Sequence, residues 1–123
     1  MGDQRLRPVE RLRCPRAYQR VFEQGEKLVG SLFILYVLPT SEPYSRLGMA
    51  VSKRLGNAVV RNRVRRRLRH LMRERIGWFP EGSLLVIRAH PAAADARQRD
   101  LAADLDLVLG TLLRRRVGAL SDG

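Results

Sequence analysis

Apolar side chains recur along the chain with two spacings, one typical of strands and the other of helices. Three dense apolar runs are predicted as strands, at residues 31–38, 46–52 and 83–88. In the first run, Phe33 and its alternate neighbours would face one side of a sheet, and Tyr36 the other. Because only a short loop separates the first two runs, we expect them to pair as antiparallel neighbours.

Three further segments are predicted as helices, because their apolar residues fall on one face. The first begins near Pro15, which suits a first helical turn, and ends at Gly25. The second begins after Asn57, whose side chain can cap the first turn. The third would be capped by Asp95 and would end at Arg114–Arg116, where the helix dipole favours positive charge.

The helix expected over residues 57–76 combines an apolar stripe with a cationic outer face. The stripe comprises Val60, Val64, Leu68, Leu71, Met72 and Ile76. The opposite side carries Asn62, Arg65, Arg66, Arg69, His70 and Arg73. Eight arginines lie between Arg61 and Arg75 against the single acid Glu74. Solvated helices usually mix charges at i, i+4, so this unmixed set favours a polyanionic partner such as RNA or DNA.

Composition agrees with a single folded domain that binds nucleic acid. The chain has 123 residues, 45% of them hydrophobic, a net charge of +12 and a pI of about 11.5. Arginine supplies 22 of its 24 basic residues, and the guanidinium fork suits bidentate phosphate contacts. We expect one domain over residues 1–123, with residues 1–13 as a loose basic arm and 117–123 as a flexible tail.

Several other classes of protein are disfavoured. The single Cys14 permits no internal disulfide and has no neighbouring zinc ligands. No apolar run reaches the roughly 18 residues of a membrane span, and the N-terminus lacks the apolar core of a signal peptide. We therefore expect a cytoplasmic protein that does not bind a membrane.

The sequence offers little catalytic machinery. His70 and His90 lie on different predicted elements, and no Ser–His–Asp or Cys–His arrangement is evident. Three acids of the last helix, Asp100, Asp104 and Asp106, fit a solvent-facing side better than a metal site. The glycine-rich motifs of nucleotide-binding loops are absent. We therefore predict a binding protein with no catalytic residue and no metal ligand of its own.

One run strongly resembles the protein subunit of bacterial ribonuclease P: Gly48-Met-Ala-Val-Ser-Lys-Arg-Leu-Gly-Asn-Ala-Val-Val-Arg-Asn-Arg-Val-Arg-Arg66. Its core, Arg61-Asn62-Arg63 after Ser52-Lys53 and Gly56-Asn57-Ala58, is that family's signature. Other features agree in order and spacing: Tyr18–Phe22 with Gly25, the strand around Phe33–Tyr36, and the strand that ends at Pro91. The resemblance covers residues 5–116.

The predicted elements follow the order αβββαβα if one optional strand is counted before the basic helix, which gives an α+β sandwich with helices packed on a small sheet. The resemblance implies the same kind of sandwich. Its βαβ crossover would be left-handed, against the general rule. The resemblance further implies that the chain is a subunit of a ribonucleoprotein endonuclease, which hydrolytically removes the 5′ leader from precursor tRNA. Its RNA subunit carries the active site and binds Mg²⁺, while the protein binds that RNA and the leader and lowers the magnesium requirement.

The resemblance also assigns residues to two surfaces. The surface facing the catalytic RNA would comprise Lys53, Arg54, Arg61, Asn62, Arg63, Arg65, Arg66 and Arg69. Tyr18, Phe22 and Tyr36 match positions of the cleft that holds the single-stranded leader, where aromatic rings can stack on unpaired bases. Relatives can carry a lysine where His90 falls, so the leader contact there passes to Arg88.

Three other classes of protein share part of this pattern. A basic ribosomal or other structural RNA-binding protein would share the charge and size. A helix-turn-helix DNA-binding protein would need a short helix before the basic one, where the sequence predicts a strand. An independent nuclease would need acidic metal ligands beside the basic helix, and there are no acids from residue 44 to residue 73. The expected partners are therefore the catalytic RNA and the leader, not DNA.

Overall fold

The structure, a computed structural model, describes residues 10–122 of the chain, with side chains up to Arg115. Its helices and strands are β1 (Glu10–Arg11), α1 (Pro15–Gln24), β2 (Glu26–Val29), β3 (Phe33–Pro39), β4 (Arg46–Ala50), α2 (Ala58–Arg75), β5 (Ser83–Ala89) and α3 (Gln98–Asp122). Three short 3-10 turns connect them: η2 (Lys53–Leu55), η3 (Ile76–Trp78) and η4 (Pro91–Ala94). None of the described helices is both long enough and apolar enough to cross a membrane.

The strands form one mixed sheet in the order β1-β4-β5-β3-β2. The expected antiparallel pairing of residues 31–38 with 46–52 is wrong, because β5 lies between β3 and β4. Six of the seven residues of β5 are buried, and a strand that is apolar on both faces belongs in the interior of a sheet. β5 is antiparallel to β3 and parallel to β4. Helix α2 therefore forms the crossover between two parallel neighbours, the unit for which the resemblance implies a left hand.

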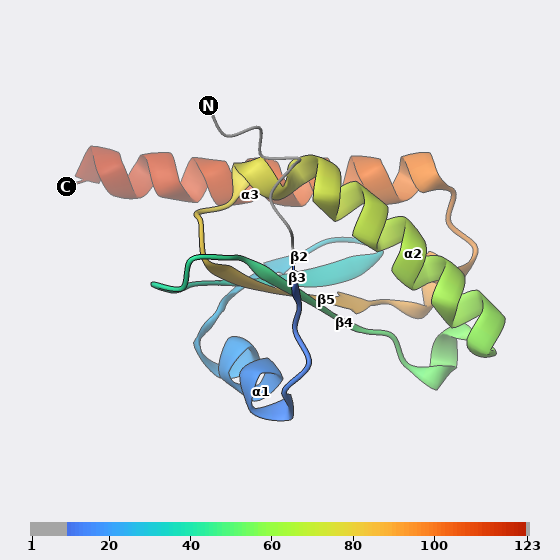
Figure 1. Ribbon diagram of the computed structural model, residues 1–123. Helices are drawn as coiled ribbons and strands as arrows, with labels where there is room; N and C mark the ends of the chain where they lie inside the picture. Colours follow the sequence, from blue (N-terminus) through green and yellow to red (C-terminus); the bar gives the residue numbers. More distant parts are fainter. Residues whose placement is uncertain (1–9, 123) are drawn as a thin grey trace.

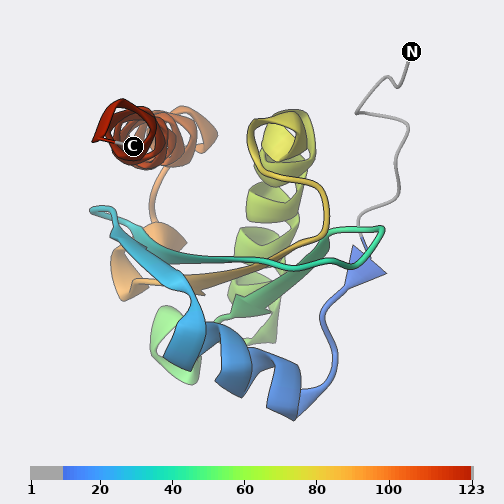
Figure 2. The same cartoon turned by 90° about the vertical axis from the view of Figure 1, so that its left-hand side faces the viewer.

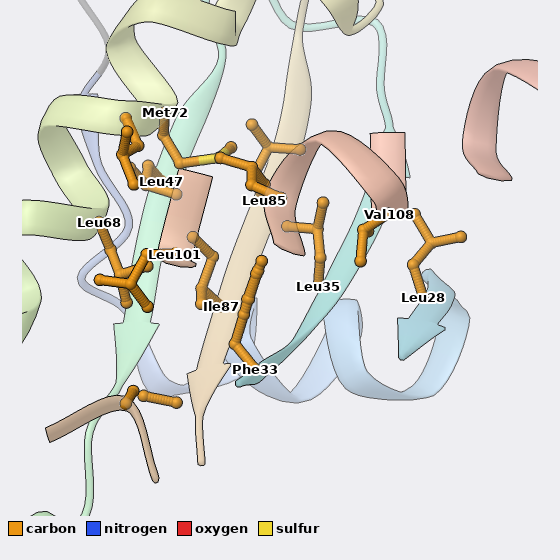
Figure 3. Close-up of a cluster of buried hydrophobic side chains, with 14 of the residues drawn as sticks. Leu28, Phe33, Leu35, Leu47, Leu68, Met72, Leu85, Ile87, Leu101 and Val108 are labelled. Atoms are coloured by element: carbon orange, nitrogen blue, oxygen red, sulfur yellow. The ribbon is translucent and has the colours of Figure 1, made fainter. Parts of the chain in front are cut away.

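The sheet lies between one helix and two (Figures 1 and 2). Helix α1 covers one face, where Leu12, Val21, Tyr36, Leu84 and Val86 form a small core. Helices α2 and α3 cover the other face over the main core, which includes Phe33, Leu35, Leu68, Leu85, Ile87, Leu101 and Val108 (Figure 3). The predicted alternation along β3 is confirmed, since Phe33 and Tyr36 lie in different cores.

The end of the predicted basic arm differs from the structure. Residues 1–9 lie outside the described residues, but Glu10–Arg11 form a strand parallel to β4, and Leu12 is buried. The backbone of α3 is helical as far as Asp122, and the flexibility expected for residues 117–123 stays a prediction. Leu12 anchors the end of the supposed arm because its side chain enters the core beneath α1.

The last helix also begins differently from the prediction. Asp95 ends the η4 turn and does not cap α3, which starts at Gln98. Instead, the Asp100 carboxylate accepts the backbone N–H of Arg97 at 3.2 Å. An acid at the third helical position that bonds back to the residue before the helix is one half of a capping box.

Candidate nucleic-acid interface

Local capping positions the cationic turn before α2. The Ser52 hydroxyl accepts the Arg54 N–H at 3.3 Å at the start of η2. Asn57 accepts the Val60 N–H at 3.1 Å, which confirms it as the N-cap of α2. Between them Gly56 has φ +143°, a conformation that favours glycine. Lys53 and Arg54 are consequently exposed on a fixed turn beside the helix.

Helix α2 packs as the sequence predicts. Four residues of the stripe on α2 are buried in the main core, as is Ile76 just after the helix. The four are Val64, Leu68, Leu71 and Met72. Val60 is partly buried against the same core. With the stripe on the sheet, the polar residues of α2 are distributed over three faces: one toward η4 and α3, one toward solvent, and one toward the β4 edge.

The face toward η4 and α3 uses arginines as internal hydrogen-bond donors. Arg63 donates through Nη2 to the Ala94 carbonyl at 3.2 Å, and Arg67 through Nη1 to the Ala96 carbonyl at 3.0 Å. Arg75 forms an ion pair with Asp106 at 2.7 Å, which raises the pKa of its guanidinium through that side-chain hydrogen bond. Arg63 was predicted to face the catalytic RNA, but the structure shows it half-buried and holding η4 in place.

The solvent face carries Asn62, Arg66, His70 and Arg73, all exposed. His70 lies 3.6 Å from Glu74. Arg66 and Arg73 form no ion pair with any residue that the structure describes. Unpaired guanidinium groups on a rigid helix can each meet a phosphate without first breaking an internal contact.

On the face toward the β4 edge, Arg65 and Arg69 lie near Gly48 and Met49. Arg61 precedes Arg65 by one helical turn, and all three arginines are half-buried. Arg65 donates to the Asn62 side-chain oxygen at 3.0 Å, a neutral partner. Partial burial, and then the positive charges of Arg11, Arg73 and Arg65, lower the pKa of Arg69. This repulsion identifies a local excess of positive charge that a polyanion would relieve.

The four predicted leader-binding residues lie together on the α1 side of the sheet. The Tyr18 and Phe22 ring centroids are 6.4 Å apart, and those of Phe22 and Tyr36 are 4.9 Å apart with the rings edge to face. The Arg88 guanidinium lies 4.8 Å from the centre of the Phe22 ring, a cation–π contact. Tyr18, Phe22, Tyr36 and Arg88 are here called the aromatic cluster.

Burial distinguishes the members of the aromatic cluster. Tyr36 is only 6% exposed, so it packs in the small core and offers no open face to a base. Tyr18 and Phe22 are half-buried, and Arg88 is exposed. The expectation that Tyr36 presents a stacking surface therefore differs from the structure, because Phe22 and α1 cover its ring. Leader binding by the other three residues stays a prediction.

The three acids considered as a metal site are dispersed by the fold. Asp100 and Asp106 are exposed, as expected for a solvent face, whereas Asp104 is buried and accepts the N–H groups of Ser31 and Leu32. Over the residues that the structure describes, no three His, Cys, Asp or Glu side chains gather to hold a metal ion.

Sequence reasoning missed Arg11, which the structure places near α2. Its residue range was predicted as a loose arm, although Leu12 between two arginines shows the alternation of a short strand. The hydrogen bonds of Arg63 and Arg67 to carbonyl groups were also missed. No local pattern reveals them, because their partners lie about 30 residues away in the chain.

The fold and this surface define a small basic α+β sandwich of the kind that binds RNA. A model of the family described as ribonuclease P matches residues 6–113. The chain belongs to this family of ribonuclease P proteins.

Individual relatives agree with the family match. The ribonuclease P protein components of Acidothermus cellulolyticus and a Nocardioides species are each 38% identical. Their matches cover 86% and 93% of this chain and 90% and 96% of the relatives. The component of Streptomyces avermitilis is 58% identical over 73 residues, a match that spans only 59% of its own length.

Solved structures show the same fold. The RNase P protein of Staphylococcus aureus superposes with a TM-score of 0.76 at 25% identity, covering 85% of this chain and 96% of that one. The RNase P protein of Thermotoga maritima gives a TM-score of 0.71 at 27% identity, covering 81% and 96%.

Proposed function

We propose that the chain is the RNA-binding protein subunit of ribonuclease P, the ribonucleoprotein that cleaves the 5′ leader from precursor tRNA in the cytoplasm. The observation that carries this proposal is the surface of α2, where Arg66 and Arg73 are exposed without an acidic partner among the described residues. A cationic surface of this kind binds RNA through its phosphates. Membership of the ribonuclease P family specifies which RNA.

The protein contributes binding, and the RNA subunit contributes the chemistry. We assign Mg²⁺ mainly to the catalytic RNA and its substrate, as the family resemblance implies. Each arginine–phosphate contact releases counterions from the RNA. The assembled complex consequently needs less Mg²⁺ to neutralise its folded RNA.

The aromatic cluster supplies a second contact, for the single-stranded leader. Tyr18 and Phe22 each leave part of a ring open, and Arg88 is exposed beside Phe22. Stacking tolerates any base, because every base has a π face. A subunit that serves precursor tRNAs with different leaders requires this tolerance.

The test is cleavage of precursor tRNA at low Mg²⁺ by the protein alone, by a bacterial ribonuclease P RNA alone, and by their mixture. Cleavage only in the mixture is the expected result. Cleavage by the protein alone would contradict the assignment of chemistry to the RNA. No cleavage in the mixture, with an RNA that is active at high Mg²⁺, would favour a ribosomal or other structural RNA-binding role.

A further inference from the structure

The outer edge of β4 is only partly covered by β1. Strand β1 pairs with Arg46 and Leu47 and then ends (Figure 2). Beyond this point the edge borders a hollow of about 160 Å³ between α1 and α2. Gly48 and Met49 form its floor, Tyr18 one wall, and Arg65 and Arg69 the opposite wall, with Arg11 beside them.

Strand geometry directs Arg11 toward α2. Leu12 enters the small core on the α1 side of the sheet, so the preceding side chain points to the other face. Arg11 is also in register with Leu47, whose side chain lies in the core beneath α2. Arg11 therefore lies on the same side of the sheet as Arg65 and Arg69, and its charge contributes to the lowered pKa of Arg69.

The wall opposite the arginines is fixed by a hydrogen bond. The Met49 N–H on the β4 edge donates to the Tyr18 hydroxyl at 3.2 Å. A Cβ at residue 48 would lie 2.5 Å from this hydroxyl, so glycine there allows the ring to rest against the strand. The hydrogen bond and the close approach at Gly48 hold the Tyr18 ring against the β4 backbone.

Among the residues that the structure describes, no carboxylate lines the hollow. Glu10, next to Arg11 in the chain, points instead to Arg46, with an oxygen 3.4 Å from its Nε. Within residues 10–115, Arg65 has only the neutral Asn62 oxygen as a partner. Three guanidinium groups consequently share one hollow to which the described part of the chain brings no negative charge, an arrangement that favours an anion with several acceptor oxygens.

We propose that Arg11, Arg65 and Arg69 form a binding site for a single backbone phosphate of RNA at the open edge of β4. The site rests on the proposed function and deepens it, because it adds a residue outside α2 and assigns that residue a discrete ligand group. Tyr18 belongs both to this hollow and to the aromatic cluster. A strand whose bases reach Phe22 can therefore place a phosphate between Tyr18 and α2.

The test compares Arg11→Gln with Arg13→Gln. Both remove one exposed positive charge, but Arg13 lies outside the hollow. The first probe is inorganic phosphate, titrated against the full chain while the arginine Nε–H signals are followed by NMR. Arg11→Gln should weaken phosphate binding about tenfold, as expected for the loss of one charged hydrogen-bonding group, and Arg13→Gln should not.

The second measurement is the salt dependence of RNA binding. Arg11→Gln should lower the log–log slope by about 0.7–0.9, the value for one lost phosphate contact, and Arg11→Lys should restore most of it. If Arg11→Gln weakens binding of precursor tRNA and leaves binding of mature tRNA unchanged, the phosphate belongs to the leader. If Arg11→Gln weakens assembly with the catalytic RNA, the phosphate belongs to that RNA. Both results support the site.

Equal behaviour of Arg11→Gln and Arg13→Gln in both measurements would overturn the site. Arg66→Gln, on the solvent face of α2, separates this failure from failure of the proposed function. If Arg66→Gln weakens assembly with the RNA, the function stands without the site. If neither Arg66→Gln nor Arg11→Gln changes any RNA affinity, both proposals fail.

Discussion

The carboxylate of Asp104, in the second turn of α3, accepts the backbone N–H of Ser31 at 2.9 Å. Its other oxygen accepts the N–H of Leu32, also at 2.9 Å. A Cβ at Gly30 would lie 2.5 Å from this carboxylate. One buried acid therefore satisfies the turn between β2 and β3 and ties α3 to the hairpin.

Replacing Asp104 by Ala should lower the free energy of unfolding by about 2–4 kcal/mol, because two backbone N–H groups lose a buried, charged acceptor. Chemical denaturation followed by circular dichroism measures the change. Asp95→Ala is the matched control, since Asp95 is exposed and does not cap α3. A control loss as large as that of Asp104→Ala would restore Asp95 as a helix cap.

Arg66→Ala and Arg63→Ala should separate RNA binding from stability. Arg66 is exposed, so its removal should lower the salt slope of RNA binding by about 0.7–0.9 and leave stability unchanged. Arg63 instead donates a hydrogen bond to the Ala94 carbonyl, so Arg63→Ala should lower the free energy of unfolding by about 1 kcal/mol. Denaturation and RNA titration of both variants check this. Equal stability of the two variants would show that the Arg63 bond contributes nothing.

Tyr36→Ala and Phe22→Ala should affect the protein differently. Tyr36 is almost fully buried, so truncation should cost about 3–5 kcal/mol and weaken binding of precursor and mature tRNA alike. Phe22 is half-buried, and its removal should weaken precursor binding selectively, by roughly 1–3 kcal/mol if it stacks on a base. Selective loss for Tyr36→Ala in a stably folded protein would instead make Tyr36 a leader contact.

Gly48→Ala should displace Tyr18, because the added methyl group would collide with its ring. We expect a loss of about 1–3 kcal/mol in stability, as for other overpacked sites. Gly110→Ala in α3 is the control, where the new methyl group meets only the end of the Arg114 side chain. That variant should gain about 0.5–1 kcal/mol from helix propensity. Thermal unfolding of both proteins would reveal whether the signs differ.

The Cys14 thiol should be more reactive in the folded protein than in the unfolded chain. The first-turn N–H groups of Ala17 and then Arg16 stabilise the thiolate and lower its pKa. Since thiolate is the reacting form, alkylation by iodoacetamide should rise with pH through a lower midpoint than in urea. The pH profile of the alkylation rate, in buffer and in urea, tests this. Coincident midpoints would contradict the prediction.

The spacing of apolar residues predicted the structural features that depend only on residues close together in the chain. The apolar stripe of α2, its Asn57 cap and the alternating faces of β3 all follow from local spacing, and the structure confirms them. The position of β5 between β3 and β4 was missed because proximity in the chain favoured a hairpin. The strand order follows burial instead, because β5, which is buried on both faces, lies in the centre of the sheet.

The sequence predicted the positive charge of the candidate site but not the burial of its individual side chains. The charge of α2 is visible in the sequence, but which of its arginines meet solvent depends on η4 and α3, as Arg63 shows. Tyr36 was assigned to the leader cleft by resemblance, and its burial depends on how α1 packs against the sheet. Arg11 was missed because its strand is only two residues long.

The central position of β5 also constrains the order of folding during synthesis. β5 is the last strand to leave the ribosome, yet it joins β3 to β4. Until residues 83–89 emerge, the sheet consists of two separate pairs, β2 with β3 and β1 with β4. Two-stranded pairs are marginally stable in water, so cooperative folding must wait for most of the chain. During that interval the nascent α2 segment is a cationic peptide without a sheet to pack on, emerging beside the RNA of the ribosome itself.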